Sequence, residues 1–165
     1  MPNQAIGEAR ARGGSDWQVR PLTAADFERV VAIDRAIVGR SRRGFYEKRL
    51  AATRQTPAAF IALGAHRDGR LEGFVLAAIL DGEFGGRAPV AVLDAIGVDP
   101  AAQGRGAGHA LTKALDAAMR QRGVRELQSE TAWANDALLR FFAAAGFKLA
   151  PRLILERPVS GFDVF

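Results

Sequence analysis

Short apolar runs alternate along the chain with segments of helical spacing, and this pattern predicts the order of the elements. The runs are bounded by turn residues and predict strands at 17–20, 59–65, 71–81, 90–98, 126–131, 147–149 and 153–157. In the connection at 66–70, the Asp68-Gly69 step marks a β-hairpin turn. The run at 90–98 is almost continuously apolar, which is typical of a central strand buried on both faces.

Apolar positions three and four residues apart predict helices between these strands. The predicted helices follow Thr23 and end at Gly39, span 45–53, run from Ala107 to Gly123, and run from Asn135 to Gly146. Thr23 and Asp26 resemble a capping box at the start of the first helix. Asp34 falls on the apolar stripe of that helix, where a carboxylate needs a partner. Either an arginine or nearby backbone binds it, or it holds a substrate loop.

The order of elements also predicts the fold class. Strand, glycine turn, helix and strand over 90–130 form a βαβ unit, which is expected to be parallel and right-handed. The earlier strands follow hairpins. We therefore expect an α/β (mixed α+β) fold with a central sheet of six to seven strands, antiparallel at first and parallel in the middle, with helices on both faces. A chain of 165 residues suits one domain, which we assign to 17–165 after a loose N-terminal tail at 1–16.

Composition narrows the class of protein. Apolar residues make up 48% of the chain and charged residues 25%, as in an ordinary soluble protein. The longest apolar run, 74–80, is far shorter than the roughly 20 residues that span a bilayer, so no membrane partner is expected. The N-terminal residues lack the apolar core of a secretory signal, which favours a cytoplasmic location. With no cysteine and only two histidines, we expect neither a disulfide nor a metal site.

The net charge of +5 comes with a cluster of basic residues at 29–54. This cluster has three interpretations: a solvated face, a surface for an acidic substrate or partner, or a nucleic-acid surface. Nucleic acid ranks last, because the segment lacks the interleaved aromatic residues on which bases stack.

The segment 98–108, with the sequence VDPAAQGRGAG, carries the clearest chemical signal. Its glycines at 104, 106 and 108 permit a tight turn and leave the backbone amides uncovered. The next helix adds the free N–H groups and positive dipole end of its first turn, which suit a phosphate. The spacing matches neither the dinucleotide fingerprint nor the Walker A motif. We therefore predict an anion-binding loop at 103–108, called here the glycine loop.

Gln103-x-x-Gly106-x-Gly108 after Val98-Asp99-Pro100, in this order of elements, resembles the GNAT superfamily of N-acetyltransferases. Asn135-Asp136-Ala137, followed by Phe141-Phe142 and Ala145-Gly146-Phe147, is similar to a second segment of that family. The pair of N-terminal helices resembles the family's acceptor wall. The resemblance covers 17–159, which is nearly the whole chain.

The resemblance implies acetyl-coenzyme A (acetyl-CoA) as the donor substrate. Its pyrophosphate would bind backbone N–H groups of Gln103, Gly104, Arg105, Gly106, Ala107 and Gly108. Its pantetheine arm would pair with Ile96, Gly97 and Val98, and Asn135 would hydrogen-bond that arm. Phe142 is also assigned to the coenzyme-binding residues, and it stands where many members carry a tyrosine that protonates the departing thiolate. A phenyl ring cannot donate a proton, so water would take that part.

Acyl transfer to an amine needs a base. The candidate carboxylates are Glu130 on a predicted strand, Asp94 on the central strand, and Glu83 in the glycine-rich loop at 81–89. Apolar neighbours raise a carboxyl pKa, which would make Asp94 a better base near neutral pH. For substrate binding, the resemblance implies the helix pair, where we assign Asp34, Arg40, Arg43 and Tyr46. For Tyr46, simple packing is the alternative.

The predicted function is an acetyl-CoA-dependent N-acetyltransferase acting on a primary amine. Protein N-termini, lysines, small amines and antibiotics all remain open as acceptors, because one fold hosts many functions. The basic segment favours an acceptor with an acidic group over a polycation. The alternative function, suggested by Phe142, is a non-catalytic acyl-CoA-binding module. Dimers are common in the resembled family, so a homodimer is compatible with the resemblance.

Overall fold

The computed structural model describes residues 16–82, 85–86 and 88–159, which divide into two compact units at 16–130 and 131–159. Each unit is described by itself. The predicted tail lies outside the described residues apart from Asp16, and so does the candidate base Glu83. The expectation of one domain over 17–165 stays a prediction.

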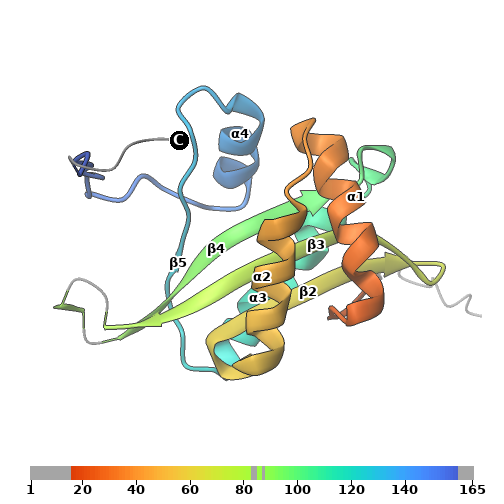
Figure 1. The fold of residues 1–165 in the computed structure, drawn as a ribbon, viewed down its shortest axis with the longest axis horizontal. Coiled ribbons are helices and arrows are strands. Elements are labelled where there is room, and N and C mark those ends of the chain that lie inside the picture. The colour runs from red at the N-terminus through yellow and green to blue at the C-terminus, as the bar shows by residue number, and fades with distance from the viewer. Residues whose placement is uncertain (1–15, 83–84, 87, 160–165) are drawn as a thin grey trace, which may run out of the picture. The chain divides into compact units, whose positions relative to one another are not determined.

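The first unit is built on a five-stranded sheet in the order β1-β2-β3-β4-β5 (Figure 1). The strands are β1 (Gln18–Pro21), β2 (Phe60–Arg67), β3 (Arg70–Asp81), β4 (Pro89–Val98) and β5 (Leu127–Gln128). The pairs from β1 to β4 are antiparallel and β4 pairs with β5 in parallel, so the predicted mixed sheet is confirmed. Asp68 (φ 50°) and Gly69 (φ 75°) both adopt the left-handed conformation, as the predicted hairpin turn requires.

Helices cover both faces of this sheet, as predicted. Helices α1 (Phe27–Val38) and α2 (Arg43–Gln55) lie on one face and α3 (Ala107–Gln121) on the other (Figure 1). Gly39 ends α1 in the left-handed conformation (φ 79°). Phe74 and Leu76 of β3 pack in the core beneath α1 and α2. Among the described residues, no helix is long and apolar enough to cross a membrane.

Two predictions about the strands were wrong. The described residues form five strands, not six to seven, because 147–149 and 153–157 join no ladder. Pro151 and Pro158 flank the second of these segments, and proline has no N–H to donate to a ladder. The strand expected at 126–131 is much shorter, because β5 pairs with β4 through Leu127 and Gln128 alone.

The second unit contains α4 (Asp136–Ala144). The Asn135 side chain caps it by accepting a hydrogen bond from the Leu138 N–H at 3.2 Å, so the predicted helix start is confirmed. Phe142 is buried and packs against Phe141 and Phe147, with ring centroids 5.8 and 4.7 Å away. Residues 148–159, after α4, form no helix or strand and are exposed.

Candidate active site

A fork opens in the sheet where β5 leaves β4. The two strands pair only at Ala91–Leu127 and Val92–Gln128, and β4 continues to Val98 without β5. The Asp99 N–H donates to the Glu72 carbonyl on β3 at 2.8 Å. Because backbone groups alternate sides along a strand, the N–H groups of Ile96 and Val98 point away from β3, toward the open edge. In the described part of the chain β5 does not pair with these two N–H groups, so the fork offers them to a ligand.

Gly97, predicted to bind the pantetheine arm, has its backbone groups on the β3 side by the same alternation. Its lack of a side chain has a packing reason. A Cβ there would lie 2.9 Å from Phe74 Cε1 and 3.1 Å from Ile37 Cδ1. Glycine lets α1 pack closely over the end of β4, beside the fork.

The glycine loop follows directly and has the geometry of an anion-binding turn. Gly104 (φ 75°) and Gly106 (φ 87°) are left-handed, which side-chain-bearing residues rarely adopt. The first bond of α3 runs from the Ala110 N–H to the Gly106 carbonyl at 3.0 Å. The N–H groups of Ala107, Gly108 and His109 therefore precede the helical ladder and are available to a phosphate.

Contacts from distant parts of the chain hold this loop and the residues just before it. The Trp17 indole N–H donates to the Arg105 carbonyl at 2.9 Å. Arg29 on α1 pairs with Asp99 and donates to the Leu71 carbonyl at 2.9 Å. The Ala101 N–H and the Arg29 guanidinium lower the pKa of the Asp99 carboxyl. Sequence reasoning missed these roles of Trp17 and Arg29, because Trp17 reaches the loop, and Arg29 reaches Asp99 before it, only through the tertiary fold.

Asp94 lies at the apex of the fork, two residues beyond the last β4–β5 pair. The β3–β4 register skips it, since Leu76 opposes Ala95 and Ala77 opposes Leu93, so Asp94 is the extra residue of a β-bulge. Arg49 on α2 contacts it, with Nε 3.0 Å from Asp94 Oδ2. Burial raises the pKa of the Asp94 carboxyl, and the Arg49 charge opposes that rise. The bulge thus points a protonatable group toward the α1–α2 side of the fork.

The other candidate bases lie elsewhere. Glu130 follows β5 and is exposed, outside any strand. Glu83 is outside the described residues. Among the described candidates, Asp94 is therefore the one inside the sheet at the fork, although the catalytic roles of Glu130 and Glu83 stay predictions.

Two of the predicted substrate residues are buried together. The Tyr46 hydroxyl donates to Asp34 Oδ1 at 2.7 Å, and Arg42 Nε donates to Asp34 Oδ2 at 3.0 Å. Tyr46 has no exposed surface and Asp34 is 3% exposed. Asp34 is thus bound by an arginine, which is the first of the two alternatives given for it above. Contact of either side chain with a substrate stays a prediction.

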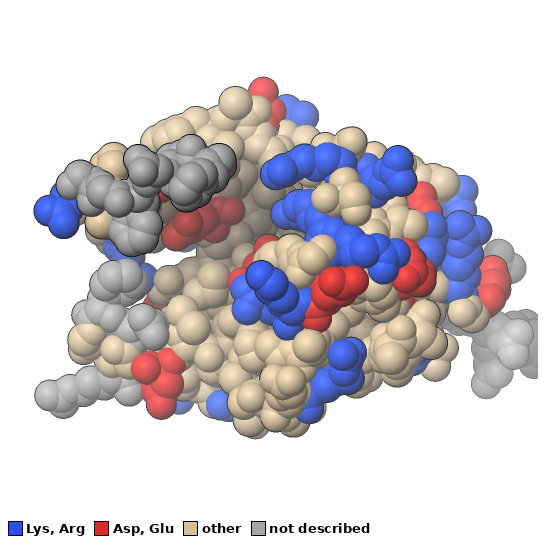
Figure 2. All heavy atoms as spheres, in the orientation of Figure 1, with Lys and Arg blue, Asp and Glu red and all other residues tan. Residues whose placement is uncertain are grey.

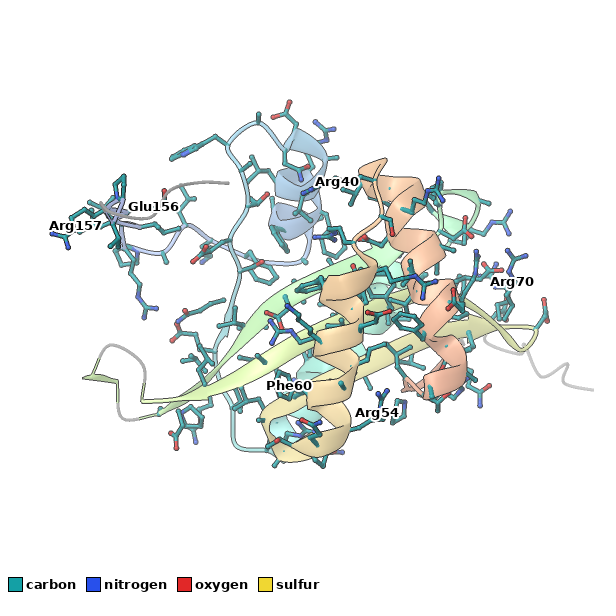
Figure 3. All side chains as sticks on the ribbon, viewed as in Figure 1. Arg40, Arg54, Phe60, Arg70, Glu156 and Arg157 are labelled. Atoms are coloured by element: carbon teal, nitrogen blue, oxygen red, sulfur yellow. The ribbon has the colours of Figure 1, made fainter. Side chains whose placement is uncertain are left out.

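The remaining predicted substrate residues belong to a basic surface. Figure 2 shows Lys and Arg side chains gathered over α1 and α2. The exposed members of this basic surface are Arg35, Arg40, Arg43, Lys48 and Arg54. Arg40 precedes α2 and Arg54 lies near its end (Figure 3). Arg43 pairs with Glu28, the closest contact being 2.6 Å, and more loosely with Glu47.

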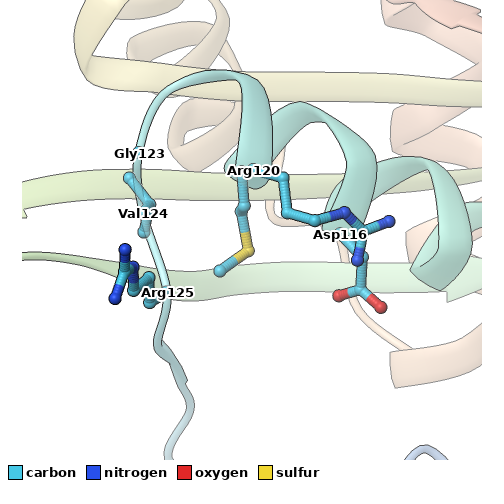
Figure 4. A pocket seen from close by; sticks show the side chains of 6 residues that line it. Asp116, Arg120, Gly123, Val124 and Arg125 are labelled. Carbon is cyan, nitrogen blue, oxygen red and sulfur yellow. The ribbon is translucent and has the colours of Figure 1, made fainter.

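A cavity of about 360 Å³ lies at the C-terminal end of α3 (Figure 4). Its lining residues are Asp116, Met119, Arg120, Gly123, Val124 and Arg125. The glycine loop is at the N-terminal end of the same helix, so this cavity is separate from the proposed pyrophosphate site. Asn135 and Phe142 belong to the second unit, and their predicted contacts with the donor stay predictions.

The mixed sheet, the fork and the glycine loop at the start of α3 define an acetyltransferase-type domain. A protein-family profile described as "Acetyltransferase (GNAT) family" matches residues 18–147. The chain therefore belongs to the GNAT acetyltransferase family, and the resemblance noted in the sequence is confirmed. A comparison with curated proteins finds no match.

Solved structures share the fold at low sequence identity. AAC(6')-Iy, in complex with the bisubstrate analog CoA-S-monomethyl-acetylneamine, is 24% identical, with a TM-score of 0.68 over 87% of this chain and 98% of that one. A transcriptional regulator from Bacillus halodurans C-125 is 19% identical, with a TM-score of 0.73 over 87% and 99%. The aminoglycoside 6'-N-acetyltransferase AAC(6')-Ih from Acinetobacter baumannii is 20% identical, with a TM-score of 0.71 over 88% and 99%.

Proposed function

We propose that this chain is an N-acetyltransferase that moves an acetyl group from acetyl-CoA directly to a primary amine. The observation that carries the proposal is the fork, where the N–H groups of Ile96 and Val98 face the edge of β4 that β5 leaves unpaired. This edge leads directly into the glycine loop. A ligand with an amide-bearing arm and a pyrophosphate matches both features in order.

The donor binds in two parts. Its pantetheine arm adds to the edge of β4 as an extra strand, since its amides match the backbone spacing. Its pyrophosphate lies on the N–H groups of the glycine loop and the first turn of α3, where the helix dipole favours negative charge. The structure of AAC(6')-Iy with a CoA-containing bisubstrate analog supports this donor.

The reaction has one covalent exchange. The neutral amine attacks the thioester carbonyl carbon to form a C–N bond, and the carbonyl oxygen becomes an oxyanion. A free N–H of Ile96 or Val98 hydrogen-bonds this oxyanion, as in other acyl transfers. The C–S bond then breaks, the amine loses a proton to a base, and the CoA thiolate takes one from water.

Asp94 is the base we favour. It lies at the apex of the fork, and burial raises the pKa of its carboxyl, which brings it closer to working pH. Glu130 and Glu83 are the alternatives. Phe142 provides no acid, and a thiolate leaves well enough to be protonated by solvent.

The first test is calorimetric titration with acetyl-CoA and CoA, followed by release of free CoA with a panel of primary amines. We expect micromolar binding and turnover with at least one amine. Absence of binding would overturn the proposal. Binding without turnover would identify the chain as the non-catalytic acyl-CoA-binding module.

Matched variants test the base. Asp94→Asn should lower kcat by about 100-fold or more while acetyl-CoA binding is retained. Asp116→Asn, on the exposed side of α3, is the control and should keep wild-type turnover. A fully active Asp94→Asn variant with an inactive Glu130→Gln variant would move the base to Glu130.

A further inference from the structure

We propose that the acceptor is an amine with a carboxylate on the adjacent carbon, as in a free α-amino acid. In this proposal Arg49 binds the acceptor's carboxylate and Asp94 receives its ammonium group. The inference rests on the proposed acetyltransferase function and names the class of its acceptor.

Arg49 is held as a fixed cation beside the fork. Its guanidinium carbon lies 5.6 Å from the ring centroids of both Phe45 and Phe60, on α2 and β2. Phe60 lies next to α2 in Figure 3. Two aromatic faces stabilise the cation and restrict its rotamers without using its N–H donors. Arg49 is therefore placed before any ligand arrives.

Most of the hydrogen-bond donors of Arg49 are unused. Within the described parts of the chain, the Arg49 Nη atoms make no hydrogen bond. A planar guanidinium with two free amino groups suits bidentate binding of a carboxylate. The side chain is 30% exposed, so a ligand can reach it.

Asp94 likewise has an unused hydrogen-bond acceptor. Within the described residues its buried Oδ2 accepts no hydrogen bond, and Arg49 Nε contacts it at 3.0 Å only as an ion pair. A buried polar atom without a hydrogen bond is rare and calls for a reason. The Asp94 side chain is 14% exposed, and an ammonium group that reaches it would give the carboxylate a hydrogen-bond donor.

The pair also has the spacing that a zwitterion requires. Arg49 and Asp94 are in direct contact, so the positive and negative subsites are adjacent. An α-amino acid carries its ammonium and carboxylate on one carbon, in the same close arrangement. Binding in this orientation places the amine at the apex of the fork, next to the predicted thioester.

The charges on the surrounding surface also favour an acceptor with a carboxylate. The exposed cations Arg43, Lys48 and Arg54 lie on α2, the helix that carries Arg49, and Arg40 lies shortly before it. The acidic residues Glu28 and Glu47 both pair with Arg43. Such a surface concentrates anions and repels polycations. An acceptor with several ammonium groups and no carboxylate would be disfavoured.

The test compares α-amino acids with the matching amino acid amides and with spermidine, measured by free CoA release. We expect kcat/KM to fall about 30-fold or more when the carboxylate becomes an amide, since Arg49 loses its charged partner. Arg49→Gln should raise KM for the amino acids by a similar factor and leave KM for the amides unchanged. Lys113→Gln, an exposed position of α3 on the other face of the sheet, is the control and should keep wild-type kinetics with both acids and amides.

Arg49→Lys and thermal melts are the controls for misfolding. Lysine keeps the positive charge beside Asp94 but lacks the planar guanidinium group. A KM intermediate between wild type and Arg49→Gln supports the proposal. Equal turnover of acids and amides, or a preference for spermidine, would overturn the acceptor class alone. If acetyl-CoA binds and no amine in the panel is acetylated, the proposed function fails instead, and the acceptor proposal fails with it.

Discussion

The indole Nε1 of Trp17 donates a hydrogen bond to the backbone carbonyl of Arg105 at 2.9 Å, although the two residues are 88 positions apart. Trp17 directly precedes β1, and Arg105 lies between the two left-handed glycines of the glycine loop. The start of the described chain therefore helps to fix the conformation of the proposed pyrophosphate site.

Trp17→Phe removes this donor while keeping an aromatic ring. A single hydrogen bond contributes about 1 kcal/mol. We expect CoA affinity to fall about 3- to 10-fold, because a loop without this hydrogen bond is less ordered and loses more conformational entropy when it binds the ligand. Calorimetric titration measures it, with Trp133→Phe as the control, since Trp133 is 93% exposed. Equal affinity for both variants would show that the bond does not order the loop.

Gly106→Ala introduces a side chain at φ 87°. The left-handed conformation costs a non-glycine residue about 1–2 kcal/mol, so stability and CoA affinity should both fall. Gly44→Ala is the matched control. It lies within α2, and a Cβ there meets nothing within 4 Å, so this change should be neutral or stabilising. Urea unfolding and CoA titration of both variants provide the comparison; indistinguishable curves would contradict the strained-turn account.

Tyr46→Phe removes a hydroxyl donor from the buried Asp34 carboxylate. The free energy of unfolding should fall by about 1–2 kcal/mol, because Arg42 retains its hydrogen bonds to Asp34 and limits the loss. Denaturant unfolding measures this change. Arg43→Gln breaks a solvent-exposed ion pair with Glu28 and should leave stability nearly unchanged. If Tyr46→Phe is as stable as wild type and impairs turnover, Tyr46 acts on the substrate rather than in the core.

Asp94 predicts a specific pH dependence of stability. Burial raises the pKa of its carboxyl in the folded state above the ordinary value of 3.8, and Arg49 opposes the rise. The folded protein thus keeps the proton to higher pH than the unfolded chain does. Its contribution to stability is present below the ordinary pKa and is lost as pH rises through the folded-state pKa.

Asp94→Asn removes the titrating carboxyl, and with it the loss of stability at higher pH. We expect the variant to be more stable than wild type at pH 7, and the difference to shrink on acidification toward the ordinary aspartate pKa. Urea midpoints at several pH values measure it, with Asp116→Asn as the exposed control. A difference that does not vary with pH would contradict a raised pKa at Asp94.

Much of the fold could be predicted from local sequence because its elements carry local signals. Asp68-Gly69 fixes the β2–β3 hairpin, Gly39 ends α1, and Asn135 caps α4, each through the conformation or hydrogen bond of one or two residues. The strand count was overestimated, since apolar character at 153–157 cannot indicate whether a ladder partner is available.

The sequence by itself determined the mixed sheet, the glycine loop and the family, because turn chemistry and apolar spacing act over a few residues. Only the tertiary structure decided which groups meet at the fork. The bulge at Asp94, its contact with Arg49 and the hydrogen bond from Trp17 to the loop depend on strand register and on helices packed over the sheet. Register and packing join residues far apart in the chain, and no local pattern encodes those pairings.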